Sequence, residues 1–350
     1  MRTQFLALRS ARRLAVALVV VLTACSGRGG DGRTVSLLHV SNDPTRELFA
    51  AINPGFAEAW ARERGGQRVE IRMSHGGSGR QARAVIDGLD ADVVSLALPF
   101  DVDAIARESG GLDPSWAERL PDRSSPFHST IVFVVRRGNP RGIRDWPDLV
   151  RGDVQVIAPS PKVSGGARYV YLGAYGYALR HGHDGRTGDE AGTEMVRELY
   201  RRVPVLDSGA RGASTTFARN GIGDVLLTWE NEAHLLLAES RGAGLEIIVP
   251  RESILAEPPV AWIDRNVERH GTRELAEAYL RHLWSPEAQE IAARMHYRPR
   301  LPEVRARHAQ AFPDVTLFTV EALFGGWDAA HRTHFADGAL FDRVYRPGGA

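Results

Sequence analysis

The stretch Ser74-His75-Gly76-Gly77-Ser78-Gly79-Arg80 separates a strand-like pattern from a helix-like one. Apolar and charged residues alternate over 69–73, which is typical of a half-buried strand, and apolar residues at spacings of three and four follow over 82–89. At a glycine-rich start of a helix, backbone N–H groups lack acceptors and the helix dipole adds partial positive charge. The stretch therefore predicts an anion site. An ordinary glycine-rich turn is the alternative, because neither a P-loop nor a spaced GxGxxG is present.

Three other segments place a similar loop between a strand pattern and a helix pattern. Residues 41–47 contain Asp43, which we expect to be an N-cap, followed by Pro44 at the first helical position. Residues 159–168 and 207–212 repeat the arrangement with glycines. A strand over 224–228 then ends at Trp229, whose indole N–H can donate but never accept. A core aromatic residue is the alternative interpretation of Trp229.

Strands that alternate with helices predict an α/β protein with mainly parallel sheets and helices on both faces. In such folds ligands bind outside the carboxyl ends of the strands, and all four loops have that position. If the loops belong to two lobes, a cleft between the lobes would collect them around one small ligand.

The amino-terminal segment is predicted to be a targeting signal. Residues 1–24 hold four arginines and no acidic residue, with an apolar run over 14–22 that is too short for a stable membrane anchor. Leu22-Thr23-Ala24-Cys25 resembles a bacterial lipobox, which implies a lipoprotein signal peptide over 1–24, acylation of Cys25 and a flexible linker over 25–33. Plain signal-peptide cleavage is the alternative.

Composition limits the class of partner. The chain has 44 basic and 43 acidic residues, so loss of the four arginines leaves a slightly acidic protein. This balance argues against nucleic acid or an anionic membrane as the partner. Cys25 is the only cysteine, and the histidines show no ligand spacing, so we expect neither a disulfide nor a metal site.

Eight motifs in order resemble one family, the periplasmic sulfate-binding proteins of sulfate/thiosulfate ABC importers. They are SNDPTREL (41–48), SHGGSGRQ (74–81), SGGAR (164–168), DSGARG (207–212), GIGDVLLTWENEA (221–233), ESILAEP (252–258), YRPR (297–300) and FGGW (324–327). The similarity covers roughly residues 35–341. It implies a two-lobed type II periplasmic-binding-protein fold, with one lobe over 34–127 and 250–350 and the other over 128–249.

The resemblance also implies a function. It predicts a monomeric receptor, in the periplasm or lipid-anchored at the outer face of the cell membrane, that passes sulfate to permease subunits with a cytoplasmic ATPase and uses no cofactor. The ligand contacts it implies are the N–H of Asp43, the N–H and hydroxyl of Ser78, the N–H groups of Gly165, Gly166 and Ala210, and the indole of Trp229. Thiosulfate, molybdate and phosphate remain alternative ligands. The chain departs from the family pattern at Asn42 and Val163.

An enzyme is the alternative class. His75-Gly76-Gly77 could serve as the oxyanion-hole motif of a hydrolase, but that fold needs a G-x-S-x-G elbow, and neither Ser78 nor Ser164 has the second glycine in place. The sequence therefore favours a binding protein without catalytic residues.

Overall fold

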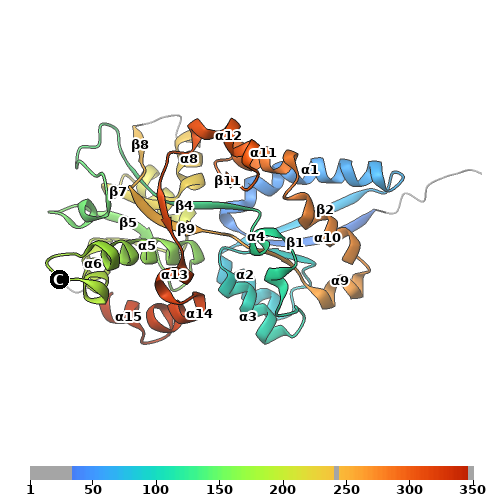
Figure 1. The fold of residues 1–350 in the computed structure, drawn as a ribbon, viewed down its shortest axis with the longest axis horizontal. Helices are drawn as coiled ribbons and strands as arrows, with labels where there is room; N and C mark the ends of the chain where they lie inside the picture. The colour runs from blue at the N-terminus through green and yellow to red at the C-terminus, as the bar shows by residue number, and fades with distance from the viewer. Residues whose placement is uncertain (1–33, 240–243, 346–350) are drawn as a thin grey trace, which may run out of the picture.

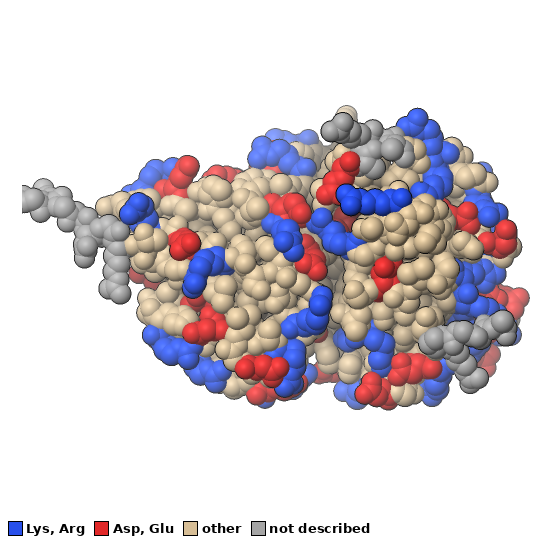
Figure 2. Space-filling view, turned by 180° about the vertical axis from the view of Figure 1, so that it is seen from behind, with Lys and Arg blue, Asp and Glu red and all other residues tan. Residues whose placement is uncertain are grey.

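A computed structural model of the chain describes residues 34–239 and 244–345. The predicted signal peptide, Cys25 and the linker up to residue 33 lie outside the described residues. The described part forms two helix-flanked sheets that lie side by side (Figure 1). We call the smaller sheet with its helices the first lobe and the larger sheet with its helices the second lobe. Figure 2 shows the seam between them from behind, bordered by basic and acidic side chains.

The first lobe is built on a four-stranded sheet with the order β10-β3-β1-β2. β1 pairs in parallel with β2 and β3, and β10 pairs antiparallel with β3. The strands are β1 (Val35–Asn42), β2 (Val69–Gly76), β3 (Val93–Ser95) and β10 (Val260–Trp262). The helices are η1 (Asp43–Thr45), α1 (Arg46–Glu63), α2 (Ser78–Ile86), α3 (Pro99–Ser109), η2 (Trp116–Glu118), α4 (Pro121–Ser124), α9 (Asp264–His270), α10 (Arg273–His282) and α11 (Pro286–Arg294).

The second lobe contains a larger sheet with the order β12-β9-β4-β7-β5-β6, in which β8 and β11 also pair with β4. Its strands are β4 (Phe127–Arg136), β5 (Val156–Pro159), β6 (Leu206–Asp207), β7 (Val225–Trp229), β8 (Leu245–Ile248), β9 (Glu252–Ala256), β11 (Arg298–Pro299) and β12 (Thr316–Phe318). Its helices are η3 (Trp146–Val150), α5 (Gly165–His181), α6 (Gly188–Arg201), α7 (Ala210–Ser214), the π-helix η4 (Thr215–Arg219), α8 (Glu230–Glu239), α13 (Val320–Phe324), α14 (Trp327–Ala330), the π-helix η6 (His331–Phe335) and α15 (Leu340–Val344). α12 (Pro302–Arg307) and η5 (Ala309–Ala311) lie between β11 and β12.

The second sheet is mixed, whereas we expected a mainly parallel one. β5 runs parallel to β6 and β7, but β4 runs antiparallel to β7, β8, β9 and β11. Whether two strands pair in parallel or antiparallel depends on how the chain crosses between the lobes. The local pattern of side chains does not predict it. The α/β class and the alternation of strands with helices are as predicted.

The carboxyl-terminal part differs from the expected division of the chain. The resemblance implies that residues 250–350 belong to the first lobe, but β9 pairs with β4, and β12 pairs with β9. The following helices place Trp327, Phe335 and Phe341 in the same hydrophobic core as α5 and α6, and Figure 1 shows α14 and α15 beside them. The spacing of apolar residues predicts that a segment is packed, but it does not tell which neighbour it packs against.

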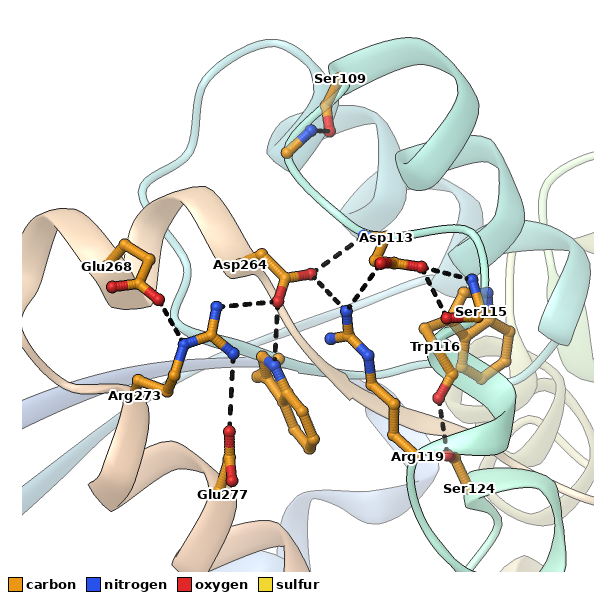
Figure 3. A network of polar contacts seen from close by, with 12 residues as sticks. Ser109, Asp113, Ser115, Trp116, Arg119, Ser124, Asp264, Glu268, Arg273 and Glu277 are labelled. Carbon is orange, nitrogen blue, oxygen red and sulfur yellow. Dashed lines mark hydrogen bonds and ion pairs between the residues drawn. The ribbon is translucent and has the colours of Figure 1, made fainter.

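A polar network holds the first lobe together where the chain leaves it and re-enters it (Figure 3). Asp264, at the start of α9, accepts hydrogen bonds from the N–H of Asp113 at 2.9 Å, from Arg119 at 2.9 Å and from Arg273 at 3.1 Å. Asp113 and Arg119 precede the first crossing, while Asp264 and Arg273 follow the return of the chain. The carboxylate thus anchors both segments to one lobe.

Among residues 34–239 and 244–345, no helix combines the length and apolar character needed to span a bilayer. The same residues hold no group of three or more His, Cys, Asp or Glu side chains arranged to bind a metal ion.

Candidate anion-binding site

All six residues predicted from the sequence line one pocket between the lobes. They are Asp43, Ser78, Gly165, Gly166, Ala210 and Trp229. The cavity has a volume of about 30 Å³, so it suits an ion of a few atoms and not a sugar or a peptide. Residues far apart in the chain thus converge on a single small space, as the position of the loops at the carboxyl ends of the strands predicts.

Four of the six residues are the first residues of helices. Asp43 begins η1, Ser78 begins α2, and Gly165 begins α5. Ala210 begins α7, which continues directly into the π-helix η4. N–H groups in a first helical turn have no acceptor within the helix, and the helix dipole adds partial positive charge there. The pocket therefore lies at a point where several backbone donors and dipoles converge.

Trp229 supplies a side-chain donor. Its side chain is almost fully buried, and its Nε1 has no hydrogen-bond partner among the described residues. The ring is held at its edge by Tyr169, with the ring centres 5.5 Å apart. A Cβ added at Gly166 would lie 3.1 Å from Nε1, so glycine at this position leaves room for the indole. A buried N–H without a partner costs free energy unless an acceptor enters the pocket.

The hydroxyl of Ser78 makes hydrogen bonds within the protein, whereas the resemblance implies that it contacts the ligand. It donates to the carboxylate of Asp101 in α3 and accepts from the N–H of Ala97 at 2.9 Å. Burial raises the pKa of Asp101, while the hydrogen bond from Ser78 and the charge of Arg168 lower it. The backbone N–H of Ser78 is therefore the group that remains for a ligand.

The sequence predicts Asp43 as an N-cap, but it lies one residue later, inside the helix. The N-cap of η1 is Asn42, and Asp43 is the first helical residue, with Pro44 following. The carboxylate of Asp43 lies 3.2 Å from the guanidinium of Arg46 in the next helix. This ion pair directs the carboxylate toward the start of α1, so the group that Asp43 can offer to an anion is its N–H.

Three polar residues in the pocket were not predicted as site residues. Ser164 caps α5 by accepting from the N–H of Ala167, and its own hydroxyl proton can still be donated. Thr228 and Asn42 are buried, and their Oγ1 and Nδ2 atoms have no partner among the described residues. Ser164 stood in a quoted motif, so its N-cap position could have revealed it, whereas nothing in the sequence shows that the side chains of Thr228 and Asn42 border the pocket.

The pocket contains no formal cation. Among the described residues that line it, none is Lys, Arg or His. Lys162 lies in the neighbouring loop, but its ammonium group contacts Asp337 at 3.1 Å and Asp342 at 3.0 Å. Arg168 is also nearby in the chain, and its guanidinium donates to the carbonyl of Pro161. Neutral donors and helix termini are thus the groups that would stabilise a bound negative charge.

The segment at the end of α11 connects loops from both lobes. The hydroxyl of Tyr297 donates to the carbonyl of Pro44 at 2.6 Å and accepts from Nδ2 of Asn231 at 3.0 Å. Arg298 contacts the buried carboxylate of Glu230 through two hydrogen bonds of 2.7 and 2.9 Å. Because Glu230 and Asn231 directly follow Trp229, these contacts hold the indole in place relative to the Asp43 loop.

The lobes are in close contact at the pocket. A Cβ added at Gly165 would lie 3.0 Å from the Cβ of Ala97 and 3.1 Å from the Cβ of Ser78, both in the first lobe. Only glycine permits this approach without displacement of neighbouring atoms. The structure therefore represents an arrangement in which the lobes have closed on the pocket.

This geometry defines a two-lobed α/β binding protein with a small, donor-rich pocket between its lobes. Residues 44–298 match the family described as bacterial extracellular solute-binding protein. The chain belongs to this family. Membership confirms the predicted fold class and the prediction of a receptor that is not an enzyme.

Individual relatives agree with this assignment. The sulfate-binding protein of Escherichia coli (strain K12) is 53% identical over 329 residues, which cover 94% of this chain and 98% of the relative. The thiosulfate-binding protein of Pseudomonas aeruginosa is 50% identical over 312 residues, covering 89% and 92%. Among solved structures, the sulfate-binding protein SubI from Mycobacterium tuberculosis H37Rv superposes with a TM-score of 0.75 at 31% identity, covering 86% of this chain and 99% of that one.

Proposed function

We propose that this protein is an extracytoplasmic receptor that binds sulfate in the pocket between its lobes and delivers it to an ABC importer. The observation that carries the proposal is the pocket itself, where helix starts and the unpartnered indole N–H of Trp229 converge without a cation. The identity of 53% with a sulfate-binding protein supports the same ligand. The proposed contacts are the N–H groups of Asp43, Ser78, Gly165, Gly166 and Ala210 and the indole of Trp229.

The donors explain how such a receptor would discriminate between oxyanions. Sulfate is fully deprotonated at neutral pH and offers only acceptors, whereas phosphate keeps at least one O–H that needs an acceptor. In a pocket of donors, that O–H would face N–H groups, at a cost of about 1–3 kcal/mol, or roughly one to two orders of magnitude in affinity. Because the carboxylate of Asp43 is paired with Arg46, it does not offer the missing acceptor.

Thiosulfate is the second candidate ligand. It presents tetrahedral acceptor faces of similar charge, and a relative of 50% identity is a thiosulfate-binding protein. Sulfate remains the first choice because the relative with the higher identity is named for it.

Isothermal titration calorimetry on protein freed of copurified ligand tests the proposal. We expect micromolar or tighter binding of sulfate and weak binding of phosphate, with thiosulfate measured in competition. Equal affinity for sulfate and phosphate would contradict a site in which N–H donors surround the anion. Binding of thiosulfate at least tenfold tighter than sulfate would shift the assignment to the second candidate.

We further propose that the receptor acts as a monomer that is tethered by acylated Cys25 and docks on permease subunits with a cytoplasmic ATPase. The motif Leu22-Thr23-Ala24-Cys25 supports the tether. In cells that express the full chain, Cys25→Ser should release the protein from the membrane fraction while purified protein still binds sulfate. Retention of the variant in the membrane fraction would contradict a lipid anchor at this residue.

A further inference from the structure

The side chain of Asn42 is a second buried donor at the anion pocket. Asn42 is the last residue of β1, where it pairs with Gly76 of β2, and both residues line the pocket. The residue is almost fully buried, and its Nδ2 has no hydrogen-bond partner among the described residues. This amide therefore resembles the indole of Trp229, because each is a buried N–H donor beside the pocket without an acceptor.

The usual role of an asparagine at the start of a helix does not account for this side chain. Asn42 is the N-cap of η1, and the side chain of an N-cap normally accepts a hydrogen bond from an N–H in the first turn of the helix. The side chain of Asn42 forms no such bond. It is therefore free of the structural task that its position would give it.

Thr45 fixes the orientation of the amide. Its hydroxyl donates to Oδ1 of Asn42 at 3.0 Å and to the backbone carbonyl of Asn42 at 2.9 Å, so that the two oxygens share one proton. Oδ1 is the only acceptor of the amide, whereas Nδ2 carries two N–H bonds. With Oδ1 held by Thr45, the group that Asn42 can offer to a ligand is a donor.

An anion in the pocket would supply the acceptor that Nδ2 lacks. A buried donor without a partner destabilises the ligand-free protein, and a hydrogen bond to a charged group is stronger than one to a neutral group. The amide would thus contribute to affinity and not to the stability of the ligand-free fold.

We propose that Asn42 is a specificity-determining residue, whose Nδ2 donates to the bound oxyanion in addition to the contacts proposed above. This inference rests on the proposed function, since it concerns the same pocket. Because residue 42 presents a donor, it favours an anion whose oxygens are all acceptors, such as sulfate, over an anion that carries an O–H, such as phosphate.

Calorimetry with sulfate and with phosphate tests the proposal on ligand-free wild type and two variants. Asn42→Leu nearly keeps the volume of the side chain but removes the donor, so the Kd for sulfate should rise about ten- to hundredfold. Asn42→Asp keeps the shape but places a carboxylate oxygen beside the anion, so the Kd for sulfate should rise about a hundredfold or more. In Asn42→Asp, the ratio of the phosphate Kd to the sulfate Kd should also fall, because the carboxylate can accept the O–H of phosphate.

The unfolding temperature separates ligand contact from a structural role. Without sulfate, Asn42→Leu should unfold at the same temperature as the wild type or at a higher one, since it removes a buried donor that has no partner. The hydroxyl of Thr45 keeps the backbone carbonyl of residue 42 as its acceptor. An asparagine that serves only the fold would instead lower the unfolding temperature when it is replaced.

Asn53 provides the matched control in the same lobe. Its Oδ1 accepts from the hydroxyl of Tyr279 at 2.7 Å, and it is not among the residues that line the pocket. Asn53→Leu should therefore lower the unfolding temperature and leave the Kd for sulfate unchanged, which is the opposite of the result expected for Asn42→Leu.

The outcomes distinguish this inference from the proposed function. If the wild type binds sulfate and Asn42→Leu binds it with the same Kd, Nδ2 does not contact the anion. If Asn42→Leu loses affinity only together with stability of the ligand-free protein, the role of Asn42 is structural and the inference is wrong. If the wild type does not bind sulfate, the proposed function fails, and the inference fails with it.

Discussion

Trp229 is the side chain whose single N–H group can be tested most directly. Replacement by Phe keeps an aromatic ring against Tyr169 but removes the donor that has no partner within the described protein. A hydrogen bond to a charged group contributes about 1.5–3 kcal/mol. We therefore expect Trp229→Phe to raise the Kd for sulfate roughly ten- to hundredfold, measured by calorimetry.

A remote indole provides the control for this substitution. The Nε1 of Trp60 donates to Gln67 at 2.9 Å within the first lobe, away from the pocket residues. Trp60→Phe should lower stability slightly and leave the Kd unchanged. An unchanged Kd in Trp229→Phe would show that the indole does not contact the ligand.

His39 makes the stability of the first lobe depend on pH. It is fully buried in β1, with Tyr279 at 2.9 Å and Ser95 at 3.0 Å from its ring nitrogens. Burial, with a smaller effect of His75, lowers its pKa from 6.5 to about 3. As the pH falls, this histidine therefore takes up a proton in the unfolded chain before it does so in the folded protein. Its contribution to the free energy of unfolding is complete above pH 6.5 and is lost between about pH 6.5 and 3.

Urea unfolding at several pH values measures this effect. Between pH 6.5 and 5, the histidine should reduce the free energy of unfolding by about 2 kcal/mol. His128, whose pKa burial also lowers to about 3, should add to the slope. The ring signals of His39 in nuclear magnetic resonance spectra should stay those of a neutral imidazole at pH 5, and a midpoint near 6.5 would show that this account is wrong.

At the scale of elements, the segment from α11 to β11 acts as a support shared by both lobes. The Tyr297 hydroxyl satisfies the carbonyl of Pro44 and the amide of Asn231 at once. Tyr297→Phe keeps the ring and leaves both groups without their partner, at a cost of about 1–3 kcal/mol. We expect a lower unfolding temperature together with a Kd for sulfate that rises about tenfold.

Tyr200 offers a matched control for the loss of one buried hydroxyl. It is also buried, but its hydroxyl has no partner among the described residues and lies in the core of the second lobe. Tyr200→Phe should therefore bind sulfate like the wild type and be at least as stable. If both variants lose affinity equally, the effect does not come from the contacts of Tyr297.

The elements also show which parts of the site could be predicted from sequence. The starts of α2 and α5 depend on nearby glycines and strand patterns, so local residues were sufficient to predict them. The direction of the Ser78 hydroxyl depends on its hydrogen bond to Asp101, which is distant in the sequence and lies in another helix. No local sequence pattern predicts this contact. The packing of Trp327 and Phe341 against the second lobe was missed for the same reason.

At the scale of the whole molecule, closure depends on how near the lobes can approach. Gly165 is a point of close contact between the lobes, where an added methyl group would meet Ala97, Ser78 and Leu98 at 3.0 to 3.2 Å. Two of these neighbours are Cβ atoms fixed to the backbone, so they cannot move aside as a flexible side chain would. Gly79, in the first turn of α2, has only the carboxylate of Asp101 at 4.0 Å from such a methyl group.

Substitution of these two glycines by alanine therefore separates closure from folding. Gly165→Ala should leave the stability of the ligand-free protein unchanged, because alanine is compatible with a helix start, yet it should raise the Kd at least tenfold, about 1.4 kcal/mol. Small-angle X-ray scattering should show that sulfate compacts the wild type and Gly79→Ala but not Gly165→Ala. Since the methyl group at residue 165 separates the lobes without removing a donor, normal compaction and affinity in Gly165→Ala would mean that the lobes do not need this close contact to hold the anion.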